Sequence, residues 1–220
     1  TTGATEEYNL SINTITAAAF ASGGNLGTAR YSLAGSGTET AALASGGGSL
    51  TTVTGDTEEY NGTSWAEQNN LSTARRQFAG GGPQTAAFVC CGKLQPNNDS
   101  RTDTEEYSGS SWTSGGSTSN ARRLHSALGT QTAGLVSGGQ PLPPGSGYIG
   151  ITEEWNGSAW TESGDLNIAR AYANMTGSQT TAVCFGGNNP SPTASRTDTE
   201  NYNGTSWTEA NNMNTARDEN

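Results

Sequence analysis

Lysine, histidine and cysteine are scarce in this chain of 220 residues, which has one lysine (Lys93), one histidine (His125) and three cysteines. Acidic residues number 20 against 10 basic ones, and the formal charge is −10. Nucleic-acid-binding proteins usually carry a basic patch or stripe, so we expect no nucleic-acid partner. A single histidine also excludes a histidine-rich metal site, and we expect no metal and no cofactor.

Long apolar runs are missing too, and only 31% of the residues are hydrophobic. Because no run reaches 18 apolar residues, we expect no insertion into a membrane. Cys90, Cys91 and Cys184 are too few for a disulfide framework and are expected to be small buried thiols. The acidic surface, rich in serine, threonine and asparagine, predicts an extracellular or virion-surface location.

A repeated segment dominates what is present. TEEY or a close variant begins at Thr5, Thr57, Thr104, Thr152 and Thr199. An aromatic residue follows each time, an arginine comes ten residues after that aromatic, and a glycine comes seventeen residues after each of the first four arginines. Such fixed distances indicate one structural unit built several times. The recurring positions of the complete units, expected to be structural, are Tyr60, Trp65, Arg75, Tyr107, Trp112, Arg122, Trp155, Trp160, Arg170, Tyr202, Trp207 and Arg217.

Each unit is predicted to contain four short antiparallel strands. Strand-length runs bounded by glycine alternate with β-favouring segments that flank Asn-Gly, which predicts a hairpin with a type I′ turn. Four strands in about 45–50 residues are typical of a propeller blade. We therefore expect an all-β propeller, with the tyrosine and tryptophan rings packed between blades. The arginines should form ion pairs with the glutamates of the TEEY segments, which are Glu6, Glu58, Glu105, Glu153 and Glu200.

These positions resemble the kelch repeat, in which a Gly-Gly pair is followed by a tyrosine, a tryptophan and an arginine. Gly138-Gly139, Trp155, Trp160 and Arg170 match that order, as Tyr107 does in the preceding unit. The resemblance covers nearly the whole chain and implies a kelch-like β-propeller. This chain differs from the kelch pattern in two places. Cys91 replaces the first glycine of one Gly-Gly pair, and the first hairpin carries seven extra residues. The near-identical TEEYNGTSW units also resemble, more loosely, repeats in tail or fibre proteins of marine phages.

The repeat divides the chain into a half blade and four full blades. Residues 1–29 form the half blade, and the full blades cover residues 30–74, 75–121, 122–169 and 170–217. Closing the ring predicts two further strands, about 25 residues, beyond Asn220 or from another chain. The ring has five blades if the chain is nearly complete, and six or seven if more units exist.

The links between the second and third strands vary most in length and sequence. Variable loops on a repeated scaffold commonly carry binding specificity, although simple surface drift would look the same. The candidate binding residues in these links are Asn97, Asn98, Arg101, Tyr148, Asn188 and Arg196.

No residue is expected to be catalytic. The paired glutamates are adjacent in sequence, so they point to opposite faces of a strand and cannot act together. His125 is expected to be a core or channel residue. The predicted function is a non-catalytic structural or binding module, as part of a virion fibre or extracellular adhesion component, with a glycan or other virion or surface proteins as partners. The alternatives are a carbohydrate-active enzyme of kelch-like fold and a ligand-free assembly scaffold that forms oligomers.

Overall fold

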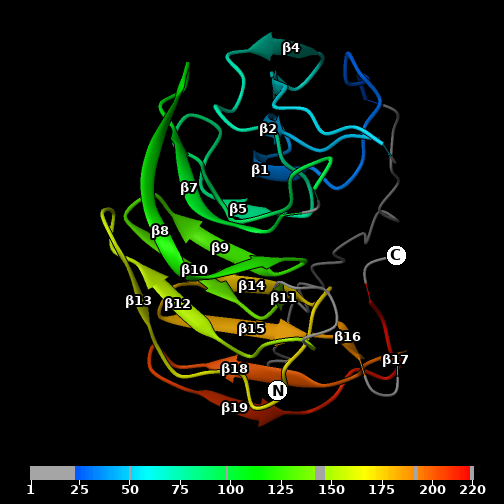
Figure 1. Ribbon diagram of the computed structural model, residues 1–220, viewed down its shortest axis with the longest axis vertical. Coiled ribbons are helices and arrows are strands. Elements are labelled where there is room, and N and C mark those ends of the chain that lie inside the picture. The colour runs from blue at the N-terminus through cyan, green and yellow to red at the C-terminus, as the bar shows by residue number, and fades with distance from the viewer. Residues whose placement is uncertain (1–22, 50, 98, 142–146, 191–192, 219–220) are drawn as a thin grey trace, which may run out of the picture.

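The computed structural model describes residues 23–49, 51–97, 99–141, 147–190 and 193–218. This part of the chain is all-β and contains no helix, and hence none that could span a membrane. Its main feature is a series of antiparallel sheets of four or five strands that follow one another in chain order (Figure 1). Most of the half blade expected at residues 1–29 lies outside the described residues.

The strands fall into four sheets with the same order of connection. The first contains β1 (Ala34–Thr38), β2 (Ala41–Ser45), β3 (Thr57–Tyr60) and β4 (Trp65–Gln68). The second contains β5 (Ala79–Gly81), β6 (Phe88–Cys90), β7 (Arg101–Tyr107), β8 (Trp112–Arg123) and, at its edge, β11 (Gln140–Pro141). The third contains β9 (Ser126–Thr130), β10 (Ala133–Ser137), β12 (Thr152–Trp155) and β13 (Trp160–Glu162). The fourth contains β14 (Asn174–Ser178), β15 (Thr181–Phe185), β18 (Thr199–Tyr202) and β19 (Trp207–Ala210).

The first strands of the four sheets lie next to one another. β1 contacts β5, β5 contacts β9, and β9 contacts β14. In Figure 1 these strands lie toward the middle, whereas β4, β8, β13 and β19 lie on the outside. This is a propeller-like arrangement of blades. A small separate hairpin, β16 (Asn188–Pro190) with β17 (Thr193–Ser195), belongs to the link between β15 and β18.

The hairpins at Asn-Gly differ from the predicted type I′ turn. Tyr60 pairs directly with Trp65, so the loop has four residues rather than two. Gly62 has a φ of 90°, but Asn61 is not among the residues with positive φ. Instead, Oδ1 of Asn61 accepts hydrogen bonds from the backbone N–H groups of Thr63 and Ser64, each at 2.9 Å. The prediction was wrong because the asparagine stabilises the loop through its side chain rather than through a left-handed backbone.

The aromatic rings join neighbouring sheets, as expected. Within a sheet, Tyr107 and Trp112 are cross-strand partners with ring centroids 4.9 Å apart. Nε1 of Trp112 donates a 3.0 Å hydrogen bond to Oγ1 of Thr57 in the preceding sheet. Trp207 repeats this bond with Thr152, again at 3.0 Å. The rings therefore combine apolar burial with a directional bond across the sheet boundary.

The repeated arginines hold successive sheets together through both main chain and side chain. The carbonyl oxygen of Arg122 accepts a 2.9 Å hydrogen bond from the N–H of Gly92, in the second unit. Its guanidinium lies in the third unit, where Nη2 is 2.5 Å from Glu153 and Nη1 donates to the carbonyl of Ile151 at 2.7 Å. Arg75 and Arg170 make the same set of contacts with Glu105 and Glu200. The guanidinium groups of all three arginines are fully buried.

The paired glutamates also fix the chain that leads from one sheet into the next. Glu153 accepts a 2.8 Å hydrogen bond from the N–H of Ser119, and Glu200 accepts one of the same length from the N–H of Asn167. Arg30 likewise pairs with Glu58 at 2.5 Å. The expected pairing is thus confirmed for four arginines, whereas Glu6 lies outside the described residues. In the pairs of Arg75, Arg122 and Arg170, backbone groups bond to both the arginine and the glutamate, which offsets the cost of burying the pair.

We expect loss of one arginine to destabilise the protein strongly. Replacement of Arg122 by methionine leaves the buried carboxylate of Glu153 without its partner, which costs about 3–5 kcal/mol of unfolding free energy. Urea unfolding measures the change. Arg101→Met is the matched control, because the Arg101 side chain is 39% exposed and pairs only with Asp103. A surface pair of this kind contributes about 0–1 kcal/mol, so equal losses in the two variants would contradict this assignment.

Candidate functional site

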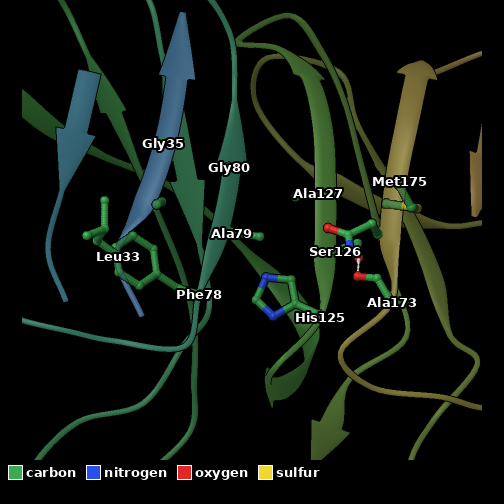
Figure 2. A pocket seen from close by; sticks show the side chains of 12 residues that line it. Leu33, Gly35, Phe78, Ala79, Gly80, His125, Ser126, Ala127, Ala173 and Met175 are labelled. Carbon is green, nitrogen blue, oxygen red and sulfur yellow. Dashed lines mark hydrogen bonds between the residues drawn. The ribbon is translucent and has the colours of Figure 1, made fainter. Parts of the chain in front are cut away.

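The first strands of all four sheets enclose a pocket, here called the channel pocket. Each sheet contributes three consecutive residues, and the lining consists of Leu33, Ala34, Gly35, Phe78, Ala79, Gly80, His125, Ser126, Ala127, Ala173, Asn174 and Met175. Its volume is about 190 Å³. Figure 2 shows the imidazole of His125 among these strands and the hydrogen bond from Ser126 to the carbonyl oxygen of Ala173. No carboxylate is among the lining residues.

A belt of backbone hydrogen bonds surrounds the entrance to this pocket. Gln77 donates its N–H to Ser32, Leu124 donates to Gln77, and Tyr172 donates to Leu124, at 2.9–3.0 Å. All four residues have left-handed φ values of 55° to 57°. Non-glycine residues seldom adopt this conformation, and here it recurs two positions after the arginine of each unit. The belt lets every sheet present one side chain to the same opening.

The opening, here called the mouth, is a second cavity of about 320 Å³. Its lining is Tyr31, Ser32, Leu33, Gln77, Phe78, Leu124, His125 and Tyr172. Two buried polar atoms in this lining have no hydrogen-bond partner among the described residues, namely Oε1 of Gln77 and Nδ1 of His125. Buried polar atoms are nearly always satisfied in folded proteins. The mouth thus combines apolar rings with hydrogen-bonding capacity that the protein itself does not use.

Three positive charges flank the mouth. Arg76 donates from Nη1 to the hydroxyl of Tyr31 at 3.0 Å, and its guanidinium lies 5.9 Å from the centre of that ring. Burial and then the charges of Arg123 and Arg76 lower the pKa of Lys93. Within the described part of the chain, none of the three forms an ion pair with a carboxylate. In a chain of charge −10, these cations make the surroundings of the mouth locally positive.

Two of the predicted binding residues take part in the arginine contacts instead. Nε of Arg101 is 2.6 Å from Asp103, and Nε of Arg196 is 2.6 Å from Asp198. Asp103 also pairs with Arg75, and the carbonyl of Asp198 accepts from Arg170. Arg101 and Arg196 therefore form partly exposed pairs with aspartates at the edge of the arginine contacts.

The other predicted residues lie in different places. Asn97 is exposed, and Asn98 lies outside the described residues. Nδ2 of Asn188 donates to Asp218 at 3.0 Å. Burial, followed by the charges of Tyr172 and Asp218, raises the pKa of Tyr148. The structure thus brings Tyr148 and Asn188 toward Asp218, and it brings Tyr148 close to the mouth.

The mouth and the cations beside it were not predicted from the sequence. The available signal was the Arg-Arg doublet, which occurs at residues 75–76 and 122–123. The first arginine of each doublet is buried in the contacts between sheets, which leaves the second, Arg76 or Arg123, to flank the mouth. A glutamine on the first turn of three units was not predicted either. Nε2 of Gln131, for example, donates to the carbonyls of Ala87 and Tyr107 in the preceding sheet.

Behind the wall of the mouth lies a cluster of Cys90, Cys91 and His125. All three are buried, and their ligand atoms lie within 4.8 Å of one another. Burial and then the charge of Arg122 lower the pKa of His125 to about 3, so its imidazole is neutral. The hydrogen bond to Cys91, followed by burial, raises the pKa of Cys90. Burial alone would raise the pKa of Cys91 too, but Cys90 and Arg122 outweigh it and lower that pKa.

Comparison with known proteins adds information about the fold. No protein-family model and no curated protein matches the sequence. Among solved structures, the chain is similar to the one described as "Structure of YjhT", with a TM-score of 0.69 and 10% sequence identity. The match covers 87% of this chain and 68% of that chain. At this identity the likeness concerns the arrangement of the strands alone.

The third cysteine, Cys184, predicts a loss of stability at alkaline pH. Burial raises its pKa from 9.0 to about 12. Between these values the unfolded chain releases the thiol proton and the folded chain does not, so stability is intact below pH 9 and falls as pH rises toward 12. The fall is about 1.4 kcal/mol per pH unit for one proton. Valine is found at this position in two other units, as Val89 and Val136, so Cys184→Val should fold. The variant has no thiol at this position and should lose the part of the pH dependence that Cys184 causes.

Urea unfolding of the two proteins from pH 8 to pH 11 measures the difference. Tyr202, whose pKa burial raises to about 12, titrates over part of the same range in both proteins and therefore cancels. Equal slopes for the wild type and the variant would show that Cys184 is not protonated in the folded protein over this range.

Proposed function

We propose that this chain is a kelch-like β-propeller that acts as a non-catalytic binding module, and that its mouth binds an anionic glycan. The observation that carries the proposal is the composition of the mouth. Tyr31 and Tyr172 supply aromatic faces, and Gln77 supplies an unpartnered buried acceptor. Arg76 and Arg123 supply positive charge beside them.

A glycan suits this combination of groups. Sugar hydroxyls can donate the hydrogen bond that the unpartnered Oε1 of Gln77 lacks. The apolar faces of sugar rings can pack on the tyrosine rings. The volume of about 320 Å³ lies at the lower end of the range for small-ligand pockets. The unpaired cations favour a sugar that carries a carboxylate or a sulfate.

The same contacts support a role in binding rather than in catalysis. The repeated glutamates, which are the obvious acid or base candidates, are paired with arginines and backbone N–H groups, and none of them lines the mouth. The channel pocket has no carboxylate in its lining. His125 is held neutral by burial, which removes it as an acid at physiological pH.

The proposed ring extends beyond the four described sheets. The carbonyl of Arg217 accepts from the N–H of Gly187 at 2.9 Å, as that of Arg75 does from Gly47. Arg217 thus makes the main-chain contact that begins a blade in the other units, and we propose that it begins a further one. Five blades result if that blade closes the ring, and six or seven if further units are inserted. We further propose a place on a virion fibre or a cell exterior, where a rigid glycan-binding scaffold meets other surface proteins.

Binding to a glycan array that contains neutral, carboxylated and sulfated glycans tests the proposal. We expect binding to acidic glycans, with affinity that falls as salt rises. Tyr172→Ser and Arg123→Ala install the residues that Ser32 and Ala171 provide at the same positions of other units, so both should fold. Each should weaken binding by about tenfold or more, which corresponds to one or two lost contacts.

Asn97→Ala serves as the control, because Asn97 is exposed in a variable link and is not among the residues that line the mouth. Equal loss in this variant would place the site in the links instead. Absence of acidic-glycan binding would overturn the proposal. Chemical conversion of a bound glycan, followed by NMR, would favour a carbohydrate-active enzyme. A large self-association with no glycan binding would favour an assembly scaffold.

A further inference from the structure

The cluster behind the mouth combines three departures from the repeat. The position three residues after the arginine holds His125 in the third unit. The other units have Leu33, Phe78 and Ala173 there. At the place of Cys90 they have Ser45, Ser137 and Phe185, and at the place of Cys91 they have Gly46, Gly138 and Gly186. The fold therefore requires none of the three, yet all three exceptions meet at one point. Two belong to the second unit and one to the third.

The backbone at Cys91 is what brings the two thiols together. Adjacent residues of an extended strand point to opposite faces. Cys91 instead has a left-handed φ of 62°, close to the 61° to 71° of Gly46, Gly138 and Gly186 at the same position. That conformation is rarely adopted by residues other than glycine. The result is that both sulfurs and one imidazole nitrogen lie within 4.8 Å of one another.

The spacing of these atoms fits a metal ion. Nε2 of His125 is 3.8 Å from Sγ of Cys90. Two ligand atoms bound at about 2.0–2.3 Å in a tetrahedral site are themselves separated by about 3.5–3.8 Å. Besides each other, the sulfurs contact the carbonyl of Ala79, 3.8 Å from Cys90 Sγ, and Oγ1 of Thr118, 3.3 Å from Cys91 Sγ. A thiol is a weak hydrogen-bonding group, so these contacts can give way to a metal ion.

We propose that Cys90, Cys91 and His125 bind one thiophilic metal ion, Zn²⁺ or Cu⁺. Two thiolates and a neutral imidazole are ligands that both ions favour. Binding of Zn²⁺ releases the two thiol protons and leaves a site with no net charge, which suits its complete burial. Because His125 also lines the mouth, the ion reaches the site from that side. The site would couple the second and third sheets beside the proposed ligand.

Metal competition with the reduced, full-length protein tests the proposal. One arm titrates Zn²⁺ against a chromophoric zinc chelator, and the other titrates Cu⁺ against a cuprous chelator without oxygen. We expect one equivalent of at least one ion to bind. Cys90→Ser, Cys91→Gly and His125→Ala each install a residue found at that position of another unit, so they should fold. Each should lower the affinity by at least about tenfold.

Cys184→Val is the matched control, since it removes the other buried thiol, and it should leave the affinity unchanged. Cobalt(II) provides a second readout, because ligation by Cys90 and Cys91 should give sulfur-to-cobalt charge-transfer absorption that Cys90→Ser reduces. The proposal is overturned if the wild type binds neither ion more tightly than the triple variant, or if Cys184→Val weakens binding as much as the other variants.

Discussion

The arginine that begins each unit is the group on which the rest of the structure depends. Its carbonyl oxygen accepts a hydrogen bond from the glycine that ends the second strand of one sheet, and its guanidinium is buried against a glutamate of the next. A buried guanidinium with five donors is costly unless each finds an acceptor. Backbone carbonyls and the glutamate together supply these acceptors. The buried ion pair is therefore satisfied only when the two sheets are packed against each other.

This arrangement decides where function can lie. The columns of charge that look like binding or catalytic groups in the sequence are used between the sheets. What remains free is the mouth, where the left-handed belt presents one side chain from each unit. The side chains there differ between units, whereas the buried arginine and glutamate recur in each. The mouth can therefore change its chemistry without a change in the sheets.

The sequence predicted much of the framework because the repeat is regular. The strands, the Tyr–Trp pairs and the Arg–Glu pairs all follow from fixed spacing. The turn at Asn61 was predicted wrongly, because Asn-Gly is compatible both with a left-handed backbone and with an asparagine side chain that accepts from the loop. The mouth was missed because it forms from residues about 45 positions apart, such as Tyr31 and Gln77, which only the closure of sheet on sheet brings together. Cys91 was recognised as a departure, but its contact with His125 depends on the packing of two sheets.

Hydrogen exchange of backbone amides tests the central role of the arginine contacts most directly. The N–H groups of Ser72, Ser119 and Asn167 lie where one sheet leads into the next, and they donate to buried glutamates. If those ion pairs hold the sheets together, these amides should exchange only through global unfolding. The amides of Thr63 and Thr205, which are bonded to exposed hairpin asparagines, should exchange much faster. Equally fast exchange in both sets would show that the sheets separate locally and would contradict the account.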